Sequence, residues 1–141
     1  MTYVFDTNAV SALMKGNPAF LERLAAVAPS DVAVPQPVLA ELAYGIERLP
    51  RSKRRTALQA RFDLLGAELP RAEWTDEVSQ SYGQVKAMLE QRGRRIEDFE
   101  AAIAAHALAS DATLVTANLG HMARIPGLLV EDWSRKPSGT R

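Results

Sequence analysis

Cysteine is absent from this chain of 141 residues, and its absence removes several classes of site at once. Neither a disulfide framework, nor a zinc–thiolate centre, nor a cysteine nucleophile is possible. A protein without disulfides has no need of an oxidising compartment. The chain is nevertheless long enough to bury a hydrophobic core without covalent or metal staples, so we expect one ordinary globular domain.

Long apolar runs and an excess of charge of one sign are also missing. No stretch approaches the roughly 18 consecutive apolar residues that a membrane-spanning helix requires. The first residues carry no basic segment and reach an acid at Asp6, which is unlike a secretory signal. We therefore expect a cytoplasmic protein with no membrane association. Because seventeen basic and seventeen acidic residues cancel, net charge indicates no particular partner.

Short apolar runs alternate with longer amphipathic segments. Buried strands are predicted at 3–5, 32–34 and 113–116, with weaker candidates at 68–69 and 128–130. Apolar residues that recur every three or four positions predict helices within 38–49, 58–65, 74–89 and 99–109. This alternation predicts an α/β domain over 1–133, with a small, mostly parallel sheet covered on both faces. Residues 134–141 lack large apolar side chains and are predicted to form a mobile tail.

Ligands of open parallel sheets bind beyond the carboxyl ends of the strands, which draws attention to Asp6. Asp6 directly follows the first predicted strand and has Thr7 and Asn8 beside it. Carboxylate, hydroxyl and amide oxygens suit Mg²⁺ or Mn²⁺. An aspartate at this place is equally compatible with a cap on the helix that follows.

Other acids occur on predicted helices. Glu41 lies early in the helix after the second strand, where a glutamate is more often solvated than functional. Asp98 and Glu100 crowd the start of an alanine-rich helix, and the helix dipole stabilises such charges by about 0.3–1 kcal/mol each without any catalytic role. If these acids converge with Asp6, they can hold cations that activate water and neutralise a phosphodiester. Spacing alone does not show convergence.

Five motifs in series give the sequence a resemblance to the PIN-domain ribonucleases, specifically the VapC toxins of bacterial toxin–antitoxin pairs. The motifs are Asp6-Thr7-Asn8, residues 37–42 with Gly45, residues 103–108, residues 113–116 with Asn118, and residues 126–128 leading to 131–133. Each motif is weak alone, but their order and spacing agree over nearly the whole chain. The resemblance implies a three-layer α/β/α fold, RNA cleavage dependent on Mg²⁺ or Mn²⁺, a homodimer, and inhibition by a small VapB-like antitoxin.

The resemblance also implies roles for individual residues. The first two metal-binding acids are Asp6 and Glu41, and Asn8 and Thr116 match polar positions that support the metal site. The family's third acid is an aspartate three residues before Ile103, where this sequence has Glu100.

The extra methylene of glutamate moves the carboxylate by roughly 1.5 Å, which a tightly held octahedral ion tolerates poorly. Because Glu100 occupies the family's position, it is still the first choice for the third ligand, and Asp98 is the second. A fourth acid that many relatives carry is not evident, because Asn118 and His121 stand in that stretch. We count Asn118 as a supporting residue. His121 is compatible with a phosphate contact or a proton carrier, although a surface histidine is the commoner case.

These departures leave two other functions open. One is a catalytically attenuated PIN-like module that binds RNA or protein without cutting it. The other is a phosphatase with an aspartyl nucleophile, since Asp6 follows the first strand. Such phosphatases need a second aspartate where Asn8 stands, so this alternative is the weaker one.

Overall fold

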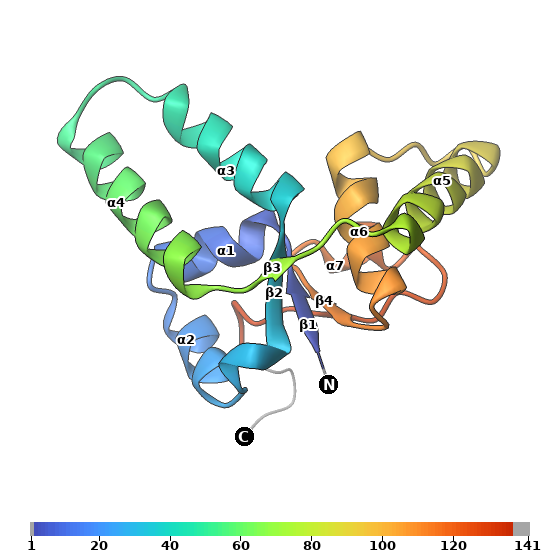
Figure 1. Ribbon diagram of the computed structural model, residues 1–141, viewed down its shortest axis with the longest axis horizontal. Helices are drawn as coiled ribbons and strands as arrows, with labels where there is room; N and C mark the ends of the chain where they lie inside the picture. The colour runs from blue at the N-terminus through green and yellow to red at the C-terminus, as the bar shows by residue number, and fades with distance from the viewer. Residues whose placement is uncertain (1, 137–141) are drawn as a thin grey trace.

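A computed structural model of the chain describes residues 2–136, and its centre is a five-stranded sheet (Figure 1). The strands are β1 (Tyr3–Phe5), β2 (Val32–Pro35), β3 (Arg71–Ala72), β4 (Thr113–Val115) and β5 (Val130–Glu131). They lie in the order β3-β2-β1-β4-β5, and every neighbouring pair is parallel. The first strand of the chain is therefore the central strand of the sheet.

Helices connect the strands and cover both sides of the sheet, which confirms the predicted α/β/α architecture (Figure 1). They are α1 (Thr7–Met14), α2 (Pro18–Ala25), α3 (Gln36–Glu47), α4 (Lys53–Glu68), α5 (Asp76–Gln91), α6 (Asp98–Ala109) and the short α7 (Leu119–Met122). A 3₁₀ turn, η1 (Pro29–Asp31), precedes β2. In Figure 1, α1 to α4 lie to the left of the sheet and α5 and α6 to the right.

An aromatic cluster forms part of the core beside the central strand. Phe5 and Trp133 are fully buried, and their ring centroids are 5.3 Å apart in an edge-to-face arrangement. Phe20 from α2 packs against both rings, at 5.2 Å from Phe5 and 5.5 Å from Trp133. Burial of such large rings is a major source of stability. The cluster fastens the end of the described chain to β1.

Two predicted strands differ from those in the structure. The strand predicted at residues 68–69 is wrong, because Glu68 ends α4 and Leu69 caps it. The edge strand β3 begins after Pro70, whose carbonyl accepts a hydrogen bond from the Val34 N–H at 2.9 Å. The second weak strand lies at Val130–Glu131 instead of 128–130. Local apolar character is a poor guide at these edges because each strand has only two residues.

Trp133, the last residue of the predicted domain, is buried in the core. Ser134 remains attached, because its N–H donates to Asp132 Oδ1 at 2.8 Å and its carbonyl accepts from Asn17 Nδ2 at 3.3 Å. Most of the expected tail, 137–141, lies outside the described residues. Within residues 2–136, none of the helices has the length and apolar character to cross a membrane.

His106 makes the stability of the fold depend on pH. Its side chain is 1 % exposed, with Nδ1 2.8 Å from the Ala102 carbonyl and Nε2 buried without a hydrogen-bond partner among the described residues. Burial lowers the pKa of His106 below its ordinary value. The folded state therefore binds this proton less readily than the unfolded state. Above about pH 6.5, the ordinary histidine pKa, His106 is neutral in both states and does not lower the stability of the fold. As the pH falls below this value the unfolded state takes up the proton first, so the fold loses stability.

We expect that His106→Leu makes the free energy of unfolding less sensitive to acid. Urea denaturation of both proteins at several pH values between about 5 and 8 measures this effect as a difference between the two pH profiles. The difference is the informative quantity, because other groups titrate in the same range. His121→Leu is the matched control, since it removes the other of the two histidines. Parallel profiles for wild type and His106→Leu would contradict the assignment.

Candidate active site

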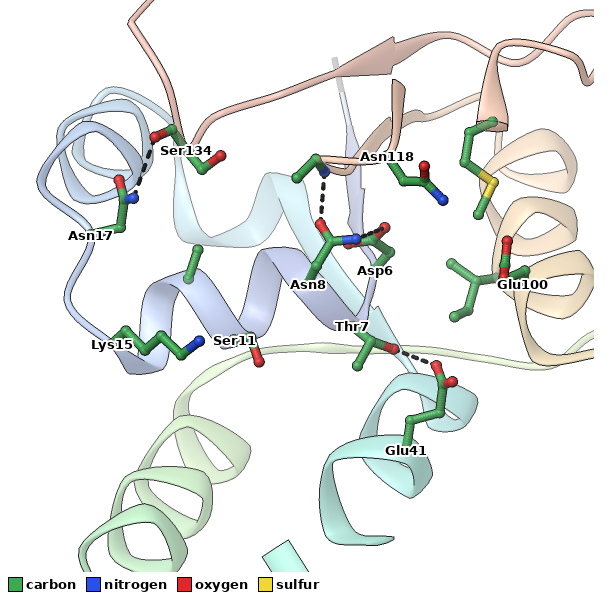
Figure 2. Close-up of a pocket in the computed structure, with 14 residues that line it drawn as sticks. Asp6, Thr7, Asn8, Ser11, Lys15, Asn17, Glu41, Glu100, Asn118 and Ser134 are labelled. Atoms are coloured by element: carbon green, nitrogen blue, oxygen red, sulfur yellow. Dashed lines mark hydrogen bonds between the residues drawn. The ribbon is translucent and has the colours of Figure 1, made fainter. Parts of the chain in front are cut away.

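A cleft of about 610 Å³ lies beyond the carboxyl end of β1 (Figure 2). Three of its lining residues are the carboxylates Asp6, Glu41 and Glu100, which come from three separate segments of the chain. Asp6 and Glu41 follow β1 and β2, whose carboxyl ends meet at one edge of the sheet, and Glu100 reaches the same cleft from the first turn of α6. The convergence of the three acids is therefore seen only in the folded chain and not in their spacing along the sequence.

Asp6 is the most deeply buried of the three carboxylates, with 4 % of its surface exposed. Its Oδ1 accepts from the Ala9 N–H at 2.9 Å and thereby caps α1, while Oδ2 accepts from Asn8 Nδ2 at 3.1 Å. Burial raises the pKa of Asp6 to about 6, although hydrogen bonds, the largest from Thr116, act in the opposite direction. Asp6 thus serves as a helix cap and also faces the cleft.

Glu41 reaches the cleft from α3, which begins directly after β2. Pro37 in the first turn suits a helix start because proline needs no N–H partner there. The half-buried Glu41 carboxylate accepts a hydrogen bond from the Thr7 hydroxyl at the start of α1 (Figure 2). Its negative charge contributes to the raised pKa of Asp6. Glu41 is therefore part of an electrostatically coupled site and is not a freely solvated glutamate.

The third predicted acid has two candidates, and the structure places them differently. Glu100 lines the cleft with Asp6 and Glu41 (Figure 2). Asp98 does not line it, and its side chain, 69 % exposed, forms an ion pair with Lys86 of α5. The hydrogen bond from Lys86 lowers the pKa of Asp98. The two acids face different neighbours because α6 turns by about 200° over two residues.

The supporting polar residues join the ends of β1 and β4. Asn8 donates to Asp6, and its Oδ1 accepts from the Ala117 N–H at 2.7 Å (Figure 2). Thr116 Oγ1 accepts from the Asn118 N–H at 2.9 Å. Asn118 itself lines the cleft. These hydrogen bonds restrain the floor of the cleft around Asp6.

The donor set is chemically suited to a hard divalent cation. It offers carboxylate oxygens from three segments together with hydroxyl and amide oxygens. Asp6 is a carboxylate that burial makes costly to ionise, and Glu100 Oε2 is buried without a hydrogen-bond partner in the described part of the chain. A bound cation would relieve both conditions. Across residues 2–136, however, no three acidic or histidine side chains are grouped closely enough to hold an ion in the arrangement seen, so these side chains would have to turn inward.

Among the polar residues of the cleft that sequence reasoning missed are Ser11 and Lys15 (Figure 2). They follow Thr7 at steps of four residues, a spacing that places side chains on one face of a helix. That spacing was the signal available in the sequence. Lys15 adds a positive charge to a cleft that otherwise carries three acids.

Comparison with known proteins gives matches over most of the chain. A family model described as the PIN domain matches residues 3–128. Ribonuclease VapC2 of Rickettsia felis is 34% identical over 137 residues, covering 96% of this chain and 100% of that protein. The tRNA(fMet)-specific endonuclease VapC of Shigella flexneri is 29% identical over 138 residues, covering 95% of this chain and 99% of that protein.

Solved structures agree with these sequence matches. The VapBC2 complex of Rickettsia felis bound to a promoter DNA fragment contains a chain with a TM-score of 0.83 and 32% identity, covering 94% of this chain and 99% of that one. The DNA-bound VapBC complex of Salmonella typhimurium contains one with a TM-score of 0.84 and 28% identity, covering 94% and 98%. The resemblance inferred from five motifs is thereby confirmed. The chain belongs to the PIN-domain family.

Proposed function

We propose that this chain is the toxin of a toxin–antitoxin pair, an endoribonuclease that hydrolyses RNA phosphodiester bonds with Mg²⁺ or Mn²⁺. The observation that carries the proposal is the convergence of Asp6, Glu41 and Glu100 in one cleft of a PIN domain. The names of the relatives, ribonuclease and tRNA endonuclease, support RNA as the substrate. The extent of the match, nearly end to end, supports transfer of the activity to the whole chain.

The chain's own residues have distinct tasks in this proposal. Asp6, Glu41 and Glu100 hold the cation, and the hydrogen bonds of Asn8 keep the Asp6 carboxylate in place. When bound, the cation supplies Lewis acidity and positive charge for the attack of water on phosphorus. Lys15 lines the other end of the cleft (Figure 2), and its positive charge supports a contact with a phosphate oxygen of the substrate. None of these tasks requires a covalent intermediate with the protein.

A small antitoxin is the proposed protein partner. The matching solved structures include VapBC complexes from Rickettsia felis and Haemophilus influenzae, at 32% and 29% identity to this chain. We also propose a homodimer. Trp74 and Phe99 are 49% and 45% exposed and line one shallow apolar depression, which supports a protein contact there. Light scattering of the purified chain distinguishes one copy from two.

The proposed activity predicts that removing the cation abolishes cleavage. Purified chain, freed of its antitoxin, should cut RNA with Mg²⁺ or Mn²⁺, lose cleavage in excess EDTA, and regain it when Mn²⁺ is added beyond the chelator. Gel analysis of a defined RNA with a 5′ label measures each step. Cleavage that persists in EDTA would contradict metal dependence. RNA binding without cleavage under any of these conditions would instead support the attenuated binding module.

A further inference from the structure

Glu100 is the least restrained acid of the cleft. Asp6 accepts hydrogen bonds from Thr116, Ala9 and Asn8, and Glu41 accepts one from Thr7, whereas Glu100 Oε2 is buried with no hydrogen-bond partner among residues 2–136. A glutamate side chain also has one more rotatable bond than an aspartate, so holding its carboxylate in one place costs more conformational entropy. A group that held this carboxylate would reduce that cost.

His121 of α7 is placed to do so. Its Nε2 lies 2.8 Å from Glu100 Oε2, which is within hydrogen-bonding distance. The two atoms form an ion pair if the imidazole is protonated, although the described structure shows no aligned hydrogen bond to this oxygen. The contact therefore joins α7 to the first turn of α6 at the edge of the cleft.

Arg124 contacts both the side chain and the backbone of His121. Arg124 Nη2 lies 2.7 Å from His121 Nδ1, and Arg124 Nε donates to the His121 carbonyl at 3.0 Å. Nη2 is also 3.1 Å from Nε2, so the guanidinium lies close to both ring nitrogens. These contacts hold the imidazole ring of His121 beside Glu100.

We propose that His121, oriented by Arg124, is a positioning residue that holds the Glu100 carboxylate in the cleft for the cation. The role of His121 in RNA cleavage rests on the proposed function, whereas its effect on the affinity of the chain for a cation can be measured without RNA. A shorter acid at position 100 has less freedom to restrain, and its carboxylate is withdrawn from His121 by roughly one C–C bond. The contribution of His121 therefore depends on the length of the side chain at position 100.

The test is Mn²⁺ binding, followed by the electron paramagnetic resonance signal of free Mn²⁺ and measured without RNA. We expect His121→Ala to weaken Mn²⁺ binding by about tenfold, the lower end of the range for partners of metal ligands. His121→Gln keeps a donor near the position of Nε2 and should recover most of the loss. In a Glu100→Asp background, His121→Ala should have little further effect. His121 is 32 % exposed, so its truncation leaves the core intact, and circular dichroism verifies the fold of each variant.

Several outcomes overturn the proposal. They are an unchanged Mn²⁺ affinity in His121→Ala, an equal loss whether His121→Ala is made in the wild-type chain or in the Glu100→Asp variant, and an absence of Mn²⁺ binding by the wild-type chain. A higher KM for RNA with unchanged Mn²⁺ affinity would assign His121 to the substrate instead. If the expected pattern of Mn²⁺ binding appears but the chain cuts no RNA, the positioning role stands and the proposed function fails.

Discussion

Asp6→Asn should reduce metal-dependent RNA cleavage by at least about 100-fold, because a charged ligand of the cation contributes several kcal/mol to the reaction. Asparagine has the same size, and its Oδ1 can still accept the Ala9 N–H that caps α1. The substitution therefore removes the charge of the most buried carboxylate of the cleft while retaining the helix cap. Initial rates at saturating Mn²⁺ measure the loss.

The same variant should be more stable than the wild-type chain at neutral pH when no cation is present. The pKa of Asp6 is raised from 3.8 to about 6, so the folded state binds its proton more readily than the unfolded state. Stability from this group is present at low pH and is lost as the pH rises from about 4 to 6. At pH 7 the ionised Asp6 side chain lowers the stability of the fold by at most about 3 kcal/mol. Asp6→Asn gains this amount minus the stability of the hydrogen bonds that it loses.

Urea denaturation in EDTA at about pH 7 and about pH 4 measures this second effect. Asp6→Asn should gain more stability relative to wild type at the higher pH than at the lower. Asp63→Asn is the matched control, because Asp63 is exposed on α4 and does not line the cleft. It should change neither cleavage nor the pH profile. Equal metal-dependent cleavage by wild type and Asp6→Asn would remove Asp6 from the active site.

Trp133→Ala should destabilise the fold by about 3–5 kcal/mol, the range for removing a fully buried large aromatic residue. Trp133 is 0 % exposed, and its ring centroid lies 4.9 Å from Tyr3 and 5.3 Å from Phe5. Its Nε1 donates to Glu131 Oε1 at 2.9 Å, and the Arg23 guanidinium lies 5.2 Å from the ring centroid. Because domains of this kind have only about 5–15 kcal/mol of stability, the variant should be close to unfolding at about 37 °C.

Urea denaturation followed by circular dichroism measures the loss. The chain offers an internal control, because Trp74, its other tryptophan, is 49% exposed. Trp74→Ala should cost clearly less than Trp133→Ala, and Trp133→Phe should lie between wild type and Trp133→Ala. Similar losses for the two alanine variants would show that Trp133 does not anchor the core.

Much of the fold was predictable because its signals are local. A buried strand followed at once by an acid, as at Asp6, needs no tertiary information to be recognised. The second strand at β2 and the alanine-rich helix α6 follow from periodicity and composition over several residues. The predicted helix from Trp74 begins too early, because Trp74 precedes the Thr75 cap of α5 and lies outside that helix. Helix ends depend on single capping hydrogen bonds, which periodicity does not reveal.

The α/β class and the acid at the carboxyl end of the first strand could be read from the order of residues alone, since both depend on neighbouring residues. The different surroundings of Glu100 and Asp98 are visible only in the folded chain. Both acids lie in the first turn of α6, and their local sequence makes either a reasonable ligand. Packing of α5 places Lys86 beside Asp98, and the approach of α7 places His121 beside Glu100. These surroundings depend on contacts between different helices, which the spacing of residues within one helix does not reveal.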